Sequence, residues 1–524
     1  MEERIKEHEK TLIKLKRSRN ALLNISTLPP EVLGTIFQCN VTLKDDFDGL
    51  EEGSHNFLFV CHHWREVALR TPGVWSFWGN TLADWARWYR HSVPAPLDLV
   101  LSIYGNDGGD GLLDMALHET LQDRAARDMI RRIHISSQGP SLPNSIILSL
   151  SAACEGVRSN SVESLILSDW SQEPIDISDF FAHYRLPKLQ HLELRRCRIT
   201  SWDLLTSRTT VLTTLVLHFH FHDLPPTATT SQLLSILASN PALRKLALSG
   251  HAIPNDGGGE SRLRVPLHHL KELQLDGGLQ HVLGLLHQLD HPGNMNHLDI
   301  SLSNCAVTDI PRIIGPYLRN HFRRRGWSRD GLGLYVGQFG GHDRDIVLHA
   351  GDVCGTSLSN PGIYGNEFVA VTLRLDQAPS NLVEKGVLDL IAHTPREDVV
   401  RFESSCMLKA VEDISAQFPN LRELRFDAVT IPLPAIFPES KVGGDEGALP
   451  SLQRIELLGS PAGEDWKPLT TFLARRASSG GRIGSVMIRY CHVCLDVEEC
   501  IRSTVQEFHH SDSTGRCFFG RCPE

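Results

Sequence analysis

One short phrase recurs along this chain and limits its fold more than any other feature. In each copy, an apolar residue is followed three and five positions later by two more. From position 162 the copies are Val162/Leu165/Leu167, Leu189/Leu192/Leu194, Leu212/Leu215/Leu217, Leu243/Leu246/Leu248, Leu270/Leu273/Leu275 and Met295/Leu298/Ile300. Their first positions are 27, 23, 31, 27 and 25 residues apart. Such a period indicates a chain built by stacking similar units.

The physical basis of the repeat is the alternation within each phrase. The last two apolar positions alternate with polar ones, which predicts a short strand with one buried face. A single unit cannot bury that face, whereas strands stacked in parallel share one core. The spacing is that of leucine-rich repeats, and helical stretches at 231–238 and 278–289 would form the outer side. We therefore expect an α/β fold, an irregular leucine-rich-repeat-like solenoid with a parallel concave sheet.

The solenoid is expected to span residues 81–500. Apolar segments at 97–101 and 133–135 predict early strands, and the phrase resumes at Leu421/Leu424/Phe426, Leu452/Ile455/Leu457 and Ile483/Val486/Ile488. Prolines at 187, 241, 419 and 450 stand two residues before a first leucine, where they block helix continuation and favour a turn into the strand. The insert at about 305–366 is irregular, and its spaced glycines indicate a hairpin or two degenerate repeats. We favour a flatter spacer there, with a hinge as a further alternative.

The concave sheet is the natural recognition surface of such a solenoid. Alternation places polar side chains there, and the expected contacts to a target protein are Glu193, Arg195, His218, His220, Gln274 and Asp276. His218, His220 and His222 should project from the same face, so that two of them could chelate a metal. No carboxylate or cysteine is placed to complete that site, and we expect solvated or partner-facing histidines instead.

The segment 25–80 has a different, helical periodicity. Thr27 can cap a helix that Pro29 and Pro30 enter, and Glu31 suits its first turn. The apolar stripe of this first helix consists of Leu28, Val32, Leu33, Ile36 and Phe37, and a second helix is marked by Leu58, Cys61, Trp64, Val67 and Ala68. The polar residues 38–56 are expected to form a loop. A unit of about 50 residues has a marginal core, so a partner should cover its leftover apolar surface.

This segment reads Leu-Pro-Pro-Glu, then Val-Cys-His-His-Trp-Arg, then Thr-Pro-Gly-Val-Trp. That order resembles an F-box, particularly in F-box proteins of mushroom-forming fungi. The resemblance implies docking onto the small adaptor that links F-box proteins to the cullin scaffold of a ubiquitin ligase. Carried over by motif, the adaptor-binding residues are Leu28, Pro29, Pro30, Glu31, Ile36, Phe37, Val60, Trp64 and Trp75. Some of them must instead fill the core of the segment itself.

The two ends of the chain carry weaker signals. Residues 1–24 predict a helix, either solvated or in a short coiled coil, because Ile5 and Leu12 and also Leu15 and Leu22 are seven residues apart. Residues 501–524 are expected to be a Cys/His-containing tail behind Cys491 and Cys494. Structural zinc would need four ligands in tetrahedral array, and a thiol-rich cap or tail is the simpler interpretation.

Composition restricts the function. The 524 residues have a net charge of −10 and contain no long basic run, which argues against nucleic acid as a partner. No stretch approaches the roughly 20 apolar residues that cross a bilayer, so no membrane is expected, and the location should be cytoplasmic or nuclear. The twelve cysteines are expected to be buried thiols rather than a disulfide framework.

We find no sequence signature of catalysis. No nucleophile elbow or Ser/His/Asp pattern is present, and the acids at Asp107, Asp110 and Asp114 lack the ligand order of an EF-hand. We expect no enzyme activity, no cofactor and no metal. The favoured function is that of a substrate-recognition subunit of a cullin-RING (SCF-type) ubiquitin ligase, with an unknown protein target. The alternative is a ligase-independent protein-interaction scaffold.

Overall fold

The structure is a computed structural model of the chain. It describes residues 1–22, 28–42, 56–78, 91–92, 95–103, 128–137, 161–169, 175–183, 186–199, 202–208, 211–219, 228–254, 264–292, 295–305, 315–319, 332–338, 345–352, 368–375, 391–395, 397–404, 418–427, 449–459, 465–490 and 493–511, with single residues 25, 256, 312, 433 and 437. Among the helices in these ranges, none is both long and apolar enough to cross a membrane. The chain divides into two compact units, Met1–Leu267 and His268–Glu524.

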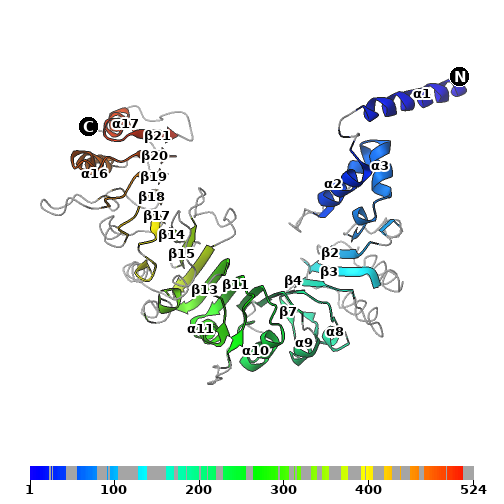
Figure 1. The fold of residues 1–524 in the computed structure, drawn as a ribbon, viewed down its shortest axis with the longest axis horizontal. Coiled ribbons are helices and arrows are strands. Elements are labelled where there is room, and N and C mark those ends of the chain that lie inside the picture. The colour runs from blue at the N-terminus through cyan, green and yellow to red at the C-terminus, as the bar shows by residue number, and fades with distance from the viewer. Residues whose placement is uncertain are drawn as a thin grey trace. The chain divides into compact units, whose positions relative to one another are not determined.

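The first unit begins with helices and continues as a sheet (Figure 1). Its helices are α1 (Glu2–Ala21), α2 (Pro30–Thr42), α3 (His62–Leu69), α8 (Ser178–His183), α9 (Asp203–Arg208) and α10 (Thr230–Ser239), with 3-10 turns η2 (Asn56–Phe59) and η3 (Pro72–Val74). Its strands are β1 (Phe77–Trp78), β2 (Leu97–Ile103), β3 (Ile130–Ser137), β4 (Ser164–Asp169), β5 (Ile175–Asp176), β6 (His191–Arg195), β7 (Cys197–Arg198), β8 (Thr214–Phe219), β9 (Lys245–Gly250) and β10 (Val265–Pro266).

The main sheet of the first unit is parallel throughout. Each strand pairs with the next in the order β1, β2, β3, β4, β6, β8 and β9. The register aligns the repeated apolar positions into buried rows, and one row runs Leu165, Leu192, Leu215 and Leu246. Neighbouring parallel strands must be joined by crossover connections. Helices α8, α9 and α10 lie in such connections, together on one side of the strands (Figure 1).

Helix α10 shows how the sequence sets the limits of these crossovers. The Thr229 side chain accepts from the Gln232 backbone, and the Gln232 side chain accepts from the Thr229 backbone, forming a capping box. Leu233, Leu234, Ile236 and Leu237 are buried on the helix face toward the core. At the other end, Asn240 donates to Ile236 O and accepts from the Leu212 backbone, which ties the helix to the start of β8.

The second unit continues the strand pattern. Its helices are α11 (Leu279–Gln288), α16 (Lys467–Ser478) and α17 (Leu495–Thr504). Its strands are β11 (Glu272–Gly278), β12 (Leu289–Asp290), β13 (His297–Cys305), β14 (Leu332–Gln338), β15 (Asp345–Asp352), β16 (Phe368–Leu375), β17 (Val399–Ser404), β18 (Glu423–Asp427), β19 (Arg454–Leu458), β20 (Ser485–Arg489) and β21 (Glu507–Ser511).

In the second unit, the described strand pairs are parallel except around one hairpin. β11, β13 and β16 pair in parallel, as do β14, β17, β18, β19, β20 and β21. β15 pairs antiparallel with both β14 and β16. The antiparallel pairing of β14 and β15 confirms the hairpin among the alternatives for the insert at 305–366. The glycines at 333 and 337 fall within β14 rather than between strands.

The predicted α/β class is confirmed at the level of a mixed fold with N-terminal helices and long parallel runs of strands. A strand forms at every phrase and at 97–101 and 133–135, and helices form at 231–238 and 278–289. Three expectations were wrong. Residues 38–42 belong to α2 rather than to a loop. Leu58 lies in η2, separate from α3, because Cys61 caps α3 by accepting from the Trp64 backbone. Residues 501–511 form the end of α17 and β21 rather than a tail.

Candidate functional site

The helical module, residues 28–78, closes its own core. Phe37 of α2 stacks on Phe57 of η2 with ring centroids 4.6 Å apart, and Trp64 of α3 lies 5.2 Å from Phe37. Leu33, Val67 and the other apolar members of the cluster are buried around them. Apolar residues three and four apart on α2 and α3 therefore face each other, as the helical periodicity predicts.

The core of the module also includes a residue from the sheet. Val100 of β2 packs in the same cluster as Phe37 and Trp75. Trp75 is fixed in place because its indole Nε1 donates to the Ala68 carbonyl at 2.7 Å. Directly after it, β1 pairs in parallel with β2. The module and the start of the sheet thus share one core and one strand ladder.

Several apolar side chains of the module remain on its surface. Ile36 is 43% exposed, Val32 lies one turn before it on α2, and both point away from the core. Phe59, the last residue of η2, is 77% exposed, and Val60, in the turn that follows, is 55% exposed. Apolar groups of this size on so small a unit indicate a surface that another molecule covers.

The nine residues that motif transfer assigned to adaptor binding differ in their exposure. Pro29, Pro30, Glu31, Ile36 and Val60 are exposed, and Leu28 and Trp64 are partly buried against the core. Phe37 and Trp75 are only 2% and 3% exposed. Both side chains pack within the core of the module, so neither presents a surface to a partner in this structure. The capping role of Thr27 lies outside the described residues.

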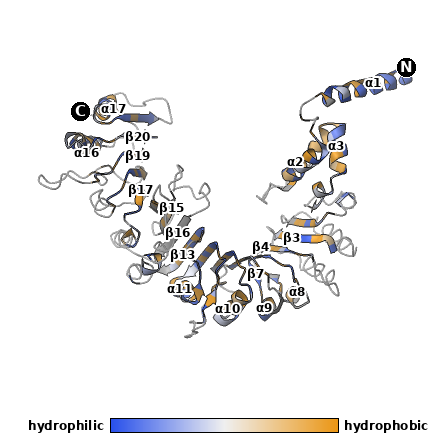
Figure 2. Ribbon diagram, in the orientation of Figure 1, coloured by the Kyte–Doolittle hydropathy of each residue, from blue (hydrophilic) through white to orange (hydrophobic). Residues whose placement is uncertain are grey.

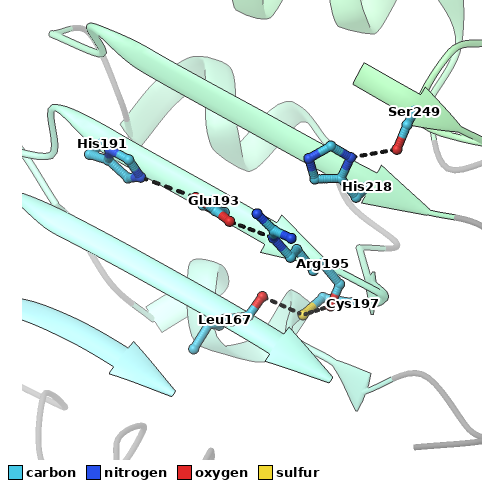
Figure 3. Close-up of polar contacts among 7 residues, drawn as sticks. All are labelled: Leu167, His191, Glu193, Arg195, Cys197, His218 and Ser249. Atoms are coloured by element: carbon cyan, nitrogen blue, oxygen red, sulfur yellow. Dashed lines mark hydrogen bonds and ion pairs between the residues drawn. The ribbon is translucent and has the colours of Figure 1, made fainter. Parts of the chain in front are cut away.

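On the sheet of the first unit, Glu193 is the centre of a polar cluster (Figure 3). Its carboxylate lies 3.5 Å from His191 Nε2 and 2.5 Å from Arg195 Nε, both on the same strand β6. Burial alone would raise the pKa of Glu193, but His191 and Arg195 outweigh it and lower that pKa to about 2. Alternation thus places the predicted Glu193 and Arg195 beside His191, and the carboxylate stays ionised.

His218 continues this polar face on the neighbouring strand. It is in register with Arg195, and its Nδ1 lies 2.6 Å from the Ser249 hydroxyl on β9 (Figure 3). The predicted histidine row can be followed only at this residue, since His220 and His222 lie outside the described residues. The hydroxyl of Ser249 is buried, which makes His218 a fixed rather than a freely rotating side chain.

His134 also lies on this face, although it was not among the predicted site residues. It lies on β3 in the same register row as Glu193, two strands away, with Ile166 of β4 between them. Burial lowers the pKa of His134 to about 4, and the opposing charge of Glu193 only partly offsets this effect. His134 is therefore neutral near pH 7.

The second unit presents a carboxylate pair on the corresponding face. Gln274 and Asp276 of β11 alternate with buried leucines as predicted, and Gln274 is in register with Asp299 of β13. Burial, followed by the charge of Asp276, raises the pKa of Asp299 to about 6. No hydrogen bond or ion pair links Asp276 or Asp299 to another residue in the described ranges.

Further along the second unit the charges compensate one another. Arg401, Glu423 and Arg454 form one register row, and Glu403, Arg425 and Glu456 form the next, so that opposite signs are neighbours in both directions. The Nε of Arg401 lies 3.7 Å from Glu423, and the Nε of Arg425 lies 3.5 Å from Glu403. Arg489 of β20 adds a 3.5 Å contact to Glu456. The least exposed members, Arg401, Glu403 and Glu456, each have an opposite charge beside them, so their charges are compensated within the sheet.

The remaining candidate sites are mostly outside the described residues. This holds for Asp107, Asp110 and Asp114 and for Cys491, Cys517 and Cys522. Of the cysteines that the structure describes, Cys197 is buried, whereas Cys39 and Cys500 are exposed, so the expectation of buried thiols was wrong for these two. The described side chains include no group of three or more His, Cys, Asp or Glu that could hold a metal ion.

Sequence reasoning missed His134, Asp299 and the charge lattice. The same alternation that selected Glu193 would have found His134, Asp299 and the lattice residues of β18 to β20, because these alternate with buried residues of predicted strands. No strand was predicted at β17, which carries Arg401 and Glu403. Sequence reasoning also missed Phe59, whose neighbour Val60 was selected by motif. No protein-family model matches this chain, and no curated protein matches it either.

Proposed function

We propose that this chain is the substrate-recognition subunit of an SCF-type ubiquitin ligase. The helical module is an F-box that docks onto the ligase adaptor, and through it onto the cullin. The parallel strands form the concave sheet of an irregular leucine-rich-repeat-like solenoid that binds a protein target. Such a subunit supplies proximity and orientation, while another protein performs the chemistry.

One observation carries the docking half of the proposal. The module already has a closed core around Phe37 and Phe57, yet Ile36, Phe59 and Val60 stay on its surface. These side chains are therefore available to a partner without unfolding the module. The F-box order of the sequence selects the adaptor as that partner, and the exposed Pro29, Pro30 and Glu31 extend the contact surface.

The shared core supports the division of labour between module and sheet. Because Val100 of β2 packs in the module core, the module is in direct contact with the first strands of the sheet. Such a contact suits a receptor that must hold its target at a set distance from the charged conjugating enzyme. Target contacts are assigned to Glu193, Arg195 and His218 in the first unit and to Gln274 and Asp276 in the second, with His220 as a further member.

Co-expression with the ligase adaptor, followed by size-exclusion chromatography, tests the docking step. We expect the wild-type chain to co-elute with the adaptor. An Ile36→Asp/Val60→Asp variant should bind about a hundredfold more weakly, which corresponds to about 2.7 kcal/mol, because two apolar contacts become buried charges.

The matched control is Val211→Asp, which changes an exposed valine of the same unit outside the module. It should co-elute like the wild type, and all three proteins should melt alike. A wild-type chain that is folded but elutes without the adaptor would remove the ligase proposal. The chain would then be treated as an interaction scaffold.

A further inference from the structure

Helix α1 is an amphipathic element with no partner in the described part of the chain. The side chains of residues 2–19 are all exposed, and Leu15 is 63% exposed. Most of the helix is hydrophilic, with a few apolar residues set among charges (Figure 2). The backbone hydrogen bonds of a charged 20-residue helix stabilise it only marginally. Most such helices in proteins are stabilised by packing against another element.

Four apolar residues of α1 and its C-cap follow a heptad spacing, whereas Ile13 lies outside it. Taking Ile5 as position a, Leu12 is the next a, and Leu15 and Leu22 are d positions. The seam also contains two polar residues, His8 at d and Arg19 at a. A seam of this kind packs against the seam of a second helix, and its polar residues favour one orientation of that helix.

Parallel pairing of two α1 helices would place identical seam residues opposite each other. Arg19 would then face Arg19 of the other copy, and His8 would face His8. Antiparallel pairing sets a positions against d positions instead. Ile5 then meets Leu22, Leu12 meets Leu15, and His8 meets Arg19, so that the arginine pair is avoided and every apolar residue keeps an apolar neighbour.

The flanking charges favour the same orientation. In the antiparallel register, Glu9 and Lys16, both at e positions, lie opposite each other twice, once on each side of the two-fold axis. The halves of the helix also complement each other. Residues 2–10 contain four acidic and three basic side chains, whereas residues 11–21 contain four basic and no acidic ones.

We propose that α1 is a self-association element that pairs two copies of this chain in an antiparallel coiled coil. The contact is isologous, because each copy offers the same surface to the other. It does not depend on the proposed ligase function. A dimer would nevertheless carry two recognition sheets, and a target with two sites would bind it with higher avidity.

Sedimentation velocity of the full chain over a concentration series tests the pairing with charge reversals. Glu9→Lys places lysine opposite Lys16, and Lys16→Glu places glutamate opposite Glu9. Each single reversal should weaken the dimer about tenfold, or about 1.4 kcal/mol. The double variant Glu9→Lys/Lys16→Glu restores opposite charges and should return to within about threefold of the wild type.

Two variants serve as controls for net charge. Glu7→Lys and Lys14→Glu make the same changes at outer positions of the helix, and both should leave the dimer unchanged. Leu12→Asp/Leu15→Asp should abolish it, while the thermal melt of the rest of the chain stays the same. A wild type that is monomeric at every concentration would overturn the proposal. So would a double charge variant as weak as the single ones, or a dimer that survives the Leu12→Asp/Leu15→Asp change.

Discussion

Replacing Phe37 by alanine should destabilise the helical module by about 3–5 kcal/mol. The ring is buried between Phe57 and Trp64, and truncation would leave a cavity that two stacked aromatic contacts now fill. Ile36 is the matched control, since it is the preceding residue on α2 but points outward. Ile36→Ala should change stability by less than about 0.5 kcal/mol.

Hydrogen exchange of the α2 and α3 amides measures this difference locally, without assuming that the whole chain unfolds in one step. Protection of both helices should fall sharply in Phe37→Ala and stay unchanged in Ile36→Ala. If Phe37→Ala kept full protection but lost the adaptor, Phe37 would be a contact residue. The burial argument would then be wrong.

Acid should act in opposite directions on the two units. In the first unit, the folded-state pKa of His134, about 4, lies below its ordinary value of 6.5. The unfolded chain therefore binds the proton more readily, and the stability gained from neutral His134 is present above pH 6.5 and lost as pH falls toward 4. The loss amounts to about 3 kcal/mol, because one pKa unit is about 1.4 kcal/mol.

In the second unit the sign is reversed. The folded-state pKa of Asp299, about 6, lies above its ordinary value of 3.8, because burial and Asp276 disfavour the charge. The folded form holds the proton more tightly, so the contribution of Asp299 to stability is complete below pH 4 and declines as pH rises to 6. About 2 kcal/mol is expected, since the side chain retains some solvent contact.

Hydrogen exchange at pH 4.5 and pH 7 distinguishes the two units in one experiment. His134→Gln should remove the acid sensitivity of β3 and β4 and leave β11 and β13 unchanged. Asp299→Asn should stabilise β11 and β13 at pH 7 and do so much less at pH 4.5. Equal responses of both units to either substitution would contradict this assignment.

The strand ladder was predictable because its signal is local. Each phrase contains both the alternation that makes a strand and the leucines that fill the core, so the positions of β4, β6, β8, β9, β11 and β13 follow from spacing alone. The hairpin of β14 and β15 was harder to predict, since glycine spacing fits either a turn or a weak repeat. β21 was missed because Phe508 is its only strongly apolar residue.

The candidate site was less predictable, because burial depends on neighbours that are distant in sequence. Motif transfer cannot distinguish Phe37 from Ile36, although the two point in opposite directions. Val100 joins the module core only because β2 folds back beside it. Similarly, the pKa of Asp299 depends on its burial in the folded chain and then on the charge of Asp276 on the neighbouring strand.

Protein half-lives in cells that carry either the wild-type chain or its Ile36→Asp/Val60→Asp variant test the central claim most directly. Proteins that co-purify with both forms are the candidate targets, because the substitution leaves the sheet intact. The account predicts that at least one of them turns over quickly with the wild type and becomes long-lived with the variant. If every co-purifying protein has the same half-life in both cells, the chain holds its partners without directing their degradation, and the ligase-receptor account is wrong.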